Sequence, residues 1–400
     1  MDINKIFLIV PKIIEQPTWG DRYILQTKSW TDKKLFKNLK IGQSYELFSG
    51  IKLRSDINSS LDPTFTGELG YGMEPDKVFY QEDKSKLIPI AKLIKQDPKW
   101  FLGKVTLKKH GPQIKILIKF TQAKGNSFQI HVKEKDSGQK WQFKAESWYC
   151  FEQGLLTLGV KKETNWDEYK NCCLKINEEM NELSKLILKN QIDLHTARTK
   201  AKIIIKKYNP WQYINLVKVK KNDLIDLSEA GLHHSWEEDK SNLFGNVVYE
   251  LCLDVMDPVS TLRCFDNAKI QNDGSIRALQ IQDYFKYIDR SWLTNNPNNH
   301  LLKPKIILNT GGVKISNLLK SKYYCLDKLE LTHDYQEKMS GSFHHLFVKE
   351  GKVVILYDKD NKAKLKLTKG HSCFIPAGIK QYLIRPIEKN KSEILKTFVS

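Results

Sequence analysis

Several short segments of the sequence carry side chains that divalent metal ions prefer. Gln129 and His131 stand two residues apart in an extended run, so both side chains point to one face of a strand, about 6.5–7 Å apart. Glu146 stands in a second extended run and can bring a hard oxygen ligand beside that pair. Imidazole, carboxylate and amide oxygen together suit zinc or another first-row divalent ion. Each fragment alone is more typical of a packed or surface residue, and it is their combination that predicts a metal site.

A histidine pair supplies a further imidazole. His233 and His234 follow Gly231, after a strand that begins near Asp223. Adjacent side chains in a strand point to opposite faces, so at most one of the two faces an ion held by the other ligands. Three or four protein ligands would leave room for water or a substrate.

The elements that must position these residues are predicted to be mostly strands. Residues 101–160 alternate apolar runs with polar turns, which is the pattern of a sheet sandwich or barrel. From 166 to about 207 the apolar spacing becomes helical, with Asn165 or Thr164 available as a cap. This segment is predicted to be an insertion of two helices, broken near 191–194.

A second strand-rich block follows the insertion. Strands return between 213 and 254, and from 305 to 384 apolar runs recur at a spacing of about 8–10 residues, as in a second barrel or jelly roll. Short helices are expected at 86–97 and 281–287. The predicted fold class is therefore mainly β, with two barrels of jelly-roll type and a small α-helical insertion.

The charge balance bears on the kind of partner. A formal net charge of +19 arises from 65 basic and 46 acidic residues, and only seven of the basic residues are Arg. The lysines are scattered along the chain, whereas nucleic-acid readers favour clustered, fork-shaped arginines. A generally lysine-rich surface is therefore favoured over nucleic-acid binding, and a small anionic substrate remains compatible.

The cysteines and the apolar runs bear on location. Seven cysteines, with an adjacent pair inside the helical segment and no metal-type spacing, indicate reduced thiols. No segment reaches the roughly 18 apolar residues that a membrane-spanning helix needs. The sequence therefore predicts a cytoplasmic protein with neither nucleic acid nor membrane as a partner.

In their order along the chain, these motifs resemble the type I mannose-6-phosphate isomerase family of the cupin superfamily. That family interconverts mannose 6-phosphate and fructose 6-phosphate through an enediol. The resemblance covers most of the chain and is poorest over 50–110. It is carried by 116–120, Gln129-Ile130-His131, Lys144-Ala145-Glu146 with Trp148-Tyr149, and Gly231-Leu232-His233-His234. It begins earlier, in Trp19-Gly20 and 41–47, and continues through 248–250, 261–263 and 274–277.

The resemblance implies one zinc ion per chain, with ligands Gln129, His131, Glu146 and His234. His234 is chosen because the family's histidine stands three positions after its glycine. His233 would then lie beside the site without binding the ion.

The resemblance also implies catalytic residues. Arg263 and Lys269 match a basic pair of the family, and Lys144 matches the lysine two positions before the metal-binding glutamate. Such cations would bind phosphate and stabilise the oxyanion that develops as a proton moves between C1 and C2. Glu250 matches a glutamate proposed as a proton carrier, but it stands thirteen residues before Arg263, where the family has about ten.

The domain division follows the same resemblance. A catalytic, metal-binding cupin is expected over 1–164 and 209–290, the helical insertion over 165–208, and a C-terminal cupin over 291–400. Within the C-terminal cupin, residues 370–381 resemble the general cupin second motif, but Gln381 stands where a metal-binding histidine is usual. The C-terminal cupin is therefore expected to lack a metal.

Two functions follow as hypotheses. The first is a metal-dependent aldose–ketose isomerase with a sugar-phosphate substrate. The second is a divergent, non-catalytic cupin that binds a sugar or sugar phosphate through the same metal. The sequence leaves the oligomeric state open between monomer and dimer.

Overall fold

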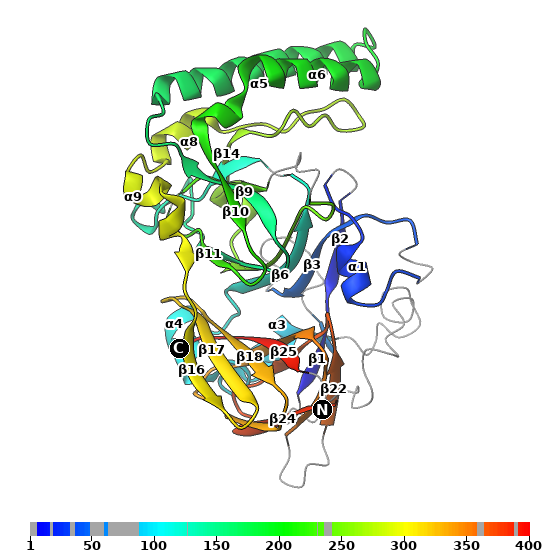
Figure 1. The fold of residues 1–400 in the computed structure, drawn as a ribbon, viewed down its shortest axis with the longest axis vertical. Helices are drawn as coiled ribbons and strands as arrows, with labels where there is room; N and C mark the ends of the chain where they lie inside the picture. Colours follow the sequence, from blue (N-terminus) through cyan, green and yellow to red (C-terminus); the bar gives the residue numbers. More distant parts are fainter. Residues whose placement is uncertain are drawn as a thin grey trace. The chain divides into compact units, whose positions relative to one another are not determined.

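The computed structural model describes residues 6–16, 19–32, 37–48, 60–62, 88–125, 127–229, 231–235, 242–357, 364–387 and 391–400. Strands dominate this part of the chain, in agreement with the predicted mainly β class (Figure 1). The chain divides into two compact units. Unit 1 comprises Met1–Gln122, Tyr249–Asp254 and Leu302–Ser400, and unit 2 comprises Ala123–Val248 and Val255–Leu301.

This division differs from the predicted domain boundaries. The first 122 residues belong to the same compact unit as the C-terminal strands, rather than to the unit with the metal-binding motifs. Strand β13 (Asn246–Leu253) passes from unit 2 into unit 1. The assignment of functions to the predicted domains stays a prediction.

Unit 1 is built largely from antiparallel strands. One sheet has the order β16-β17-β18-β25-β20-β23-β1-β4-β5, a second has the order β19-β24-β21-β22, and β2, β3 and β6 pair in sequence. Strand β1 pairs with β23, so early and late parts of the chain meet in one sheet. The elements of unit 1 are β1 (Phe7–Val10), β2 (Lys12–Glu15), α1 (Tyr23–Thr27), β3 (Ile41–Leu47), β4 (Ser60–Asp62), β5 (Ile88–Pro89), α3 (Ile90–Gln96), α4 (Pro98–His110), β6 (Ile116–Ala123), β16 (Lys305–Thr310), β17 (Val313–Lys320), β18 (Cys325–Leu331), β19 (Tyr335–Lys338), β20 (His344–Glu350), β21 (Lys352–Leu356), β22 (Lys364–Thr368), β23 (Ser372–Ile375), β24 (Gln381–Pro386) and β25 (Ser392–Phe398).

Helix α4 corrects the beginning of the region predicted as strands, 101–160. Asp97 caps the helix by accepting a hydrogen bond from the Trp100 N–H at 2.8 Å, and Pro98 stands in the first turn, where its missing N–H costs nothing. Gly103 interrupts the helix with φ 77° and ψ 164°. The sequence pattern missed α4 because its apolar residues do not gather on one face.

Unit 2 contains a five-stranded sheet and further strands outside that sheet. The sheet has the order β10-β9-β12-β7-β14, and β8 pairs with β11. The helices and strands of unit 2 are β7 (Phe128–Ile130), β8 (Glu146–Cys150), β9 (Gly154–Val160), α5 (Trp166–Leu188), α6 (Leu194–Tyr208), β10 (Ile214–Val219), β11 (Leu224–Asp226), β12 (His233–Ser235), α7 (Asp257–Ser260), β14 (Leu262–Phe265), α8 (Ile281–Tyr287) and α9 (Trp292–Asn295). Strand β15 (Leu301–Leu302) lies at the boundary with unit 1.

Helices α5 and α6 confirm the two helices expected over 165–208. The Asn165 side chain accepts hydrogen bonds from the N–H groups of Asp167 and Glu168 at 3.0 and 3.2 Å, which is the predicted cap. Helix α6 ends at Tyr208, and the next residue, Asn209, has a φ of 43°, in the left-handed region that stops a helix. Helix α8 lies where 281–287 was expected to be helical.

The five-stranded sheet of unit 2 carries an apolar layer on the side of α5 and α8. Phe128 and Ile130 of β7, with Leu262 and Cys264 of β14, are buried in the same apolar cluster as residues of both helices. Side chains alternate along a strand, so the residues between these four point to the opposite face of the sheet. That opposite face is where the predicted ligands of β7 lie.

A second apolar group supports the opposite face. It joins Trp148 of β8, Leu158 of β9 and Ile225 of β11, all of which are buried. Because a one-residue slip in register would exchange the two faces of each strand, this double burial fixes the register of the site-bearing strands.

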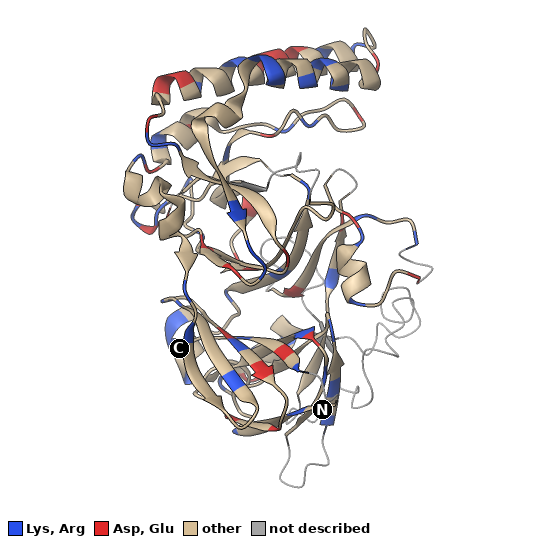
Figure 2. Cartoon of the chain, in the orientation of Figure 1, with Lys and Arg blue, Asp and Glu red and all other residues tan. Residues whose placement is uncertain are grey.

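Charged residues are spread over the described chain. Figure 2 shows Lys and Arg on helices and strands of both units, with Asp and Glu among them. Helices α5 and α6 carry both signs, and two of their ion pairs are Glu182 with Lys185 and Glu179 with Lys207.

None of the helices in the described chain combines the length and the apolar character needed to cross a membrane.

Two glycines offer a matched test of packing in unit 1. Gly103 and Gly111 have similar backbones, with φ of 77° and 73°, in a region that costs a residue with a side chain about 1–3 kcal/mol. A Cβ at Gly103 would lie 2.3 Å from the Gly341 carbonyl oxygen, whereas a Cβ at Gly111 meets nothing within 4 Å. We expect Gly103→Ala to lower the free energy of unfolding by about 2 kcal/mol more than Gly111→Ala. Urea denaturation of both variants measures the difference, and equal losses would contradict the close contact.

Buried histidines make unit 1 sensitive to acid. Burial, with a further contribution from the Lys28 ammonium, lowers the pKa of His345 and of His371 to about 3. The unfolded chain binds these protons near pH 6.5, so between about pH 6.5 and 3 it holds more protons and stability falls as the pH falls. We expect His371→Gln to remove about 2 kcal/mol of the stability difference between pH 7 and 4.5. Urea midpoints at both pH values test this, with the exposed His333→Gln as the control that changes nothing.

Candidate metal centre

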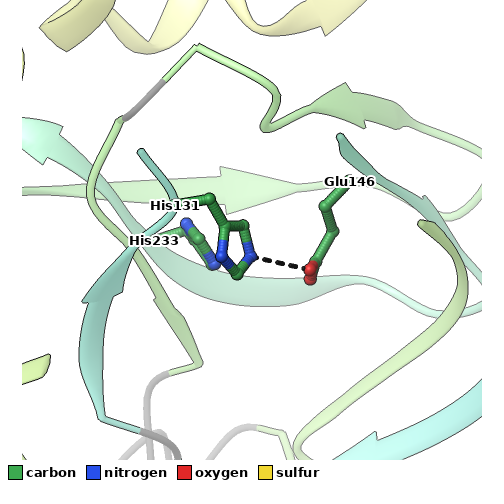
Figure 3. A group of neighbouring side chains, drawn as sticks. All are labelled: His131, Glu146 and His233. Atoms are coloured by element: carbon green, nitrogen blue, oxygen red, sulfur yellow. Dashed lines mark hydrogen bonds and ion pairs between the residues drawn. The ribbon is translucent and has the colours of Figure 1, made fainter. Parts of the chain in front are cut away.

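Three buried side chains of unit 2 converge on one point (Figure 3). His131 directly follows β7, Glu146 opens β8 and His233 opens β12. Their ligand atoms all lie within 4.8 Å of one another. His131 Nε2 lies 2.9 Å from Glu146 Oε2, and the centroids of the two imidazole rings lie 5.1 Å apart. These residue types at this spacing form a candidate site for a divalent ion.

Backbone carbonyls determine which nitrogen of each ring faces the cluster. His131 Nδ1 lies 2.7 Å from the Ser260 carbonyl oxygen, and His233 Nδ1 lies 3.1 Å from the Gly231 carbonyl oxygen. A carbonyl oxygen accepts and never donates, so each Nδ1 carries the hydrogen and each neutral ring offers its Nε2 lone pair to the cluster. Metal-binding histidines are commonly oriented by such a second hydrogen bond.

A lysine supplies positive charge to this cluster. The Nε2 lone pair of a neutral His131 and the ionised Glu146 oxygen would repel each other without a cation or proton nearby. Lys144 Nζ forms a buried ion pair with Glu146 Oε2 and lies 3.4 Å from His131 Nε2, so the ammonium donates to both. Trp148 Nε1 donates to the other oxygen of Glu146 at 2.7 Å. The electron-rich atoms are thus already gathered around a positive charge.

Burial and charge set the protonation states. Burial lowers the pKa of His131, and the nearby Lys144 ammonium lowers it further. Burial likewise lowers the pKa of His233 to about 3, with His131 adding to the effect. Burial alone would raise the pKa of Glu146, but the Lys144 ammonium holds it well below its usual range. At neutral pH the imidazoles are neutral and the carboxylate is ionised, which are the forms that bind metals.

Gln129 joins the cluster through His233. Its amide nitrogen lies 3.0 Å from His233 Nε2. In the sheet, Gln129 stands directly opposite His233 of β12 on one side and Arg263 of β14 on the other. Residues opposite each other in antiparallel strands point to the same face. His233, Gln129 and Arg263 therefore form a row across three strands, on the face away from α5.

Arg263 has polar partners in this row. Its Nε donates to Ser127 Oγ at 2.8 Å, and one terminal nitrogen lies 2.9 Å from Asp257 Oδ2. Its sequence neighbours, Leu262 and Cys264, are apolar, so its charge needs an anionic partner. That partner in the structure is a carboxylate of the chain itself.

The other two predicted catalytic residues each have partners of their own. Lys269 Nζ donates to the Gly125 carbonyl oxygen at 3.0 Å, shortly before β7. Glu250 belongs to unit 1, where it is buried and its Oε1 lies 2.5 Å from Lys119 Nζ. Thr121 Oγ1 lies 3.5 Å from its other oxygen. The catalytic roles of Lys269 and Glu250 stay predictions.

The structure brings together most, but not all, of the residues that the sequence singled out. Gln129, His131 and Glu146 share one cluster with Lys144. The side chain of His234 lies outside the described residues, so its assignment as a ligand stays a prediction. His233, which the sequence placed beside the site, lies within the cluster.

Sequence reasoning missed three residues of the site. They differ in how far the sequence could have indicated them. Ser127 stands two residues before Gln129, so strand alternation could have placed it on the same face. Ser260 acts through its backbone carbonyl, for which the sequence carries no signal. Asp257 reaches Arg263 from the short helix α7, in a stretch where the sequence departs from the family spacing.

The donor set fits zinc. Two neutral imidazoles and an ionised carboxylate, with the Gln129 amide beside His233, match the nitrogen and oxygen ligands that zinc takes in catalytic sites. A zinc ion would neutralise the same carboxylate that Lys144 neutralises here. The ligands would be held by the Ser260 and Gly231 carbonyls and by Trp148.

Zinc content tests the ligand set. We expect His131→Ala and His233→Ala to lose most bound zinc, because each removes an Nε2 aimed into the cluster. His300→Ala is the matched control, since this buried histidine of the same unit has both ring nitrogens on backbone carbonyls, those of Asp226 and Thr294. Elemental analysis of the purified variants gives the result. If His233→Ala keeps its full zinc content while His234→Ala loses zinc, the ligand is His234 and not His233.

Comparisons with known proteins bear on the family. Residues 314–386, which span β17 to β24, match the family model described as "Mannose-6-phosphate isomerase, cupin domain". A comparison with curated proteins finds no match.

Solved structures match over nearly the whole chain. The mannose 6-phosphate isomerase from Bacillus subtilis has a TM-score of 0.65 at 14% identity, covering 98% of this chain and 99% of that chain. A mutant of phosphomannose isomerase from Salmonella typhimurium gives 0.64 at 12% identity, covering 99% of each chain. A mannose 6-phosphate isomerase described as holo and zinc bound gives 0.62 at 13% identity, covering 98% of this chain and 99% of that chain. Residues 314–386 thus match the cupin domain of the mannose-6-phosphate isomerase family, and the chain as a whole has the fold of the solved mannose 6-phosphate isomerases.

Proposed function

We propose that this protein is a metal-dependent aldose–ketose isomerase that interconverts mannose 6-phosphate and fructose 6-phosphate. The observation that carries the proposal is the buried cluster of His131, Glu146 and His233, with a lysine in contact and an arginine on the same sheet face. The fold shared with mannose 6-phosphate isomerases supports the choice of substrate.

The chemistry requires an electrophile and a proton carrier near one sugar. A proton on carbon beside a carbonyl is barely acidic in water, so the oxyanion that forms must be stabilised by fixed positive charge. Zinc, when bound, would supply Lewis-acid stabilisation of that oxygen. We propose His131, Glu146, His233 and Gln129 as the residues that hold it.

The cations of the site have distinct proposed roles. Lys144 donates to Glu146 and His131, so its ammonium lies where developing negative charge on the substrate would be stabilised. Arg263 lies two strands from His233 in the same row and is proposed to bind an anionic or hydroxyl group of the sugar phosphate. Lys269 and Glu250 are retained as a further phosphate-binding residue and a proton carrier, respectively.

A coupled assay tests the proposed reaction. The purified full-length protein should convert mannose 6-phosphate, lose activity on chelation and regain it when zinc is added back. No turnover by protein with zinc bound would contradict the isomerase and leave the sugar-binding, non-catalytic cupin as the better function.

The role of Arg263 has a separate readout. We expect Arg263→Ala to keep its zinc and to lose about 100-fold or more in kcat/KM, because the variant lacks a charge that contacts the substrate. Arg198→Ala is the control, since this arginine of α6 bonds to the Ile270 carbonyl and to Asn272 rather than to the cluster. Equal activity in the two variants would place the substrate site elsewhere.

A further inference from the structure

The short helix α7 connects the arginine of the site to a metal-ligand candidate. Asp257, at its start, has Oδ2 2.9 Å from Arg263, and the Ser260 carbonyl oxygen, at its end, lies 2.7 Å from His131 Nδ1. Thr261 Oγ1 donates to the other Asp257 oxygen at 3.1 Å. One turn of chain thus carries a carboxylate on the guanidinium and the carbonyl that orients an imidazole.

The two partners of this ion pair differ in exposure. The Arg263 side chain is 13% exposed and is also held by Ser127, whereas the Asp257 side chain is 40% exposed. Moving Asp257 into water therefore costs little, while moving Arg263 would break a buried contact. In an exchange of partners, the carboxylate is the group that leaves and the guanidinium is the group that stays.

The position of Arg263 makes such an exchange relevant to a ligand. The arginine stands beside Gln129 in the row that ends at His233, on the face of the cluster. A carboxylate and a phosphate both offer paired oxygens to the same edge of a guanidinium. Asp257 and an anionic ligand would therefore compete for one set of donors.

We infer that Asp257 is an internal placeholder that determines how tightly the site takes an anion. This inference rests on the proposed function and specifies it: the phosphate-bearing substrate must displace the Asp257 carboxylate from Arg263. The placeholder keeps the guanidinium oriented before the ligand arrives and lowers the affinity for any small anion. When displaced, Asp257 keeps the Thr261 hydroxyl as a partner.

The test measures binding of inorganic phosphate to the zinc-loaded, full-length protein by isothermal titration calorimetry. We expect Asp257→Asn, which keeps the side-chain shape and removes the charge, to bind phosphate about five-fold more tightly than the natural chain. Asp257→Ala should shift affinity in the same direction. Asp273→Asn is the matched control for net charge, because this exposed aspartate of unit 2 bonds to Ser275 instead.

Several outcomes decide the matter. Unchanged or weaker phosphate binding by both Asp257 variants would overturn the inference, as would equal tightening by Asp273→Asn. The double variant Asp257→Asn with Arg263→Met should lose the gain, and tight binding that persists would place the anion elsewhere. Phosphate binding can be measured without turnover. If the protein is inactive as an isomerase but Asp257→Asn still binds phosphate more tightly, the proposed reaction is wrong and the inference about Asp257 stands.

Discussion

Two imidazole lone pairs and a carboxylate face one another inside unit 2, and this group requires a positive charge to be stable. A buried charge without a partner costs several kcal/mol, more than a typical single contact returns. Lys144 meets this requirement in the structure, and the proposed zinc ion would meet it during function. Three further groups hold the members of this cluster in place. The Ser260 carbonyl orients His131, the Gly231 carbonyl orients His233, and Trp148 donates to Glu146.

The sheet that presents these groups separates packing from chemistry by strand alternation. On β7 and β14 the residues facing α5 are apolar and form one core, while Gln129 and Arg263 face the other way. The register is fixed because both faces are buried, so a slip would turn apolar side chains toward the polar cluster and bury the arginine in the apolar layer. The helical insertion therefore contributes to the site indirectly, by holding one face of the strands that bear it.

Much of the site could be predicted from the sequence because its logic is local. Gln129 and His131 share a face by their two-residue spacing, and Glu146 belongs to a recognisable second strand. The sequence could not decide which of His233 and His234 faces the cluster. Side chains alternate along a strand, so only one of the two can do so, but the alternation does not show which one. The partner of Arg263 was equally hidden, because it comes from a turn whose shape depends on tertiary contacts. Helix α4 escaped detection because its cap and proline signals were not matched by an apolar face.

The order of the two units along the chain has a consequence for synthesis on the ribosome. Unit 2 ends at Leu301, whereas the main sheet of unit 1 needs β1 beside β23 and stays open until the last hundred or so residues emerge. The proposed ligands span residues 129 to 233, and the α5–α6 hairpin between them can form from local contacts as it leaves the exit tunnel. The candidate metal centre could thus assemble on a nascent protein whose other unit is still incomplete. The N-terminal strand must meanwhile wait, unpaired on that side, for a partner made more than 360 residues later.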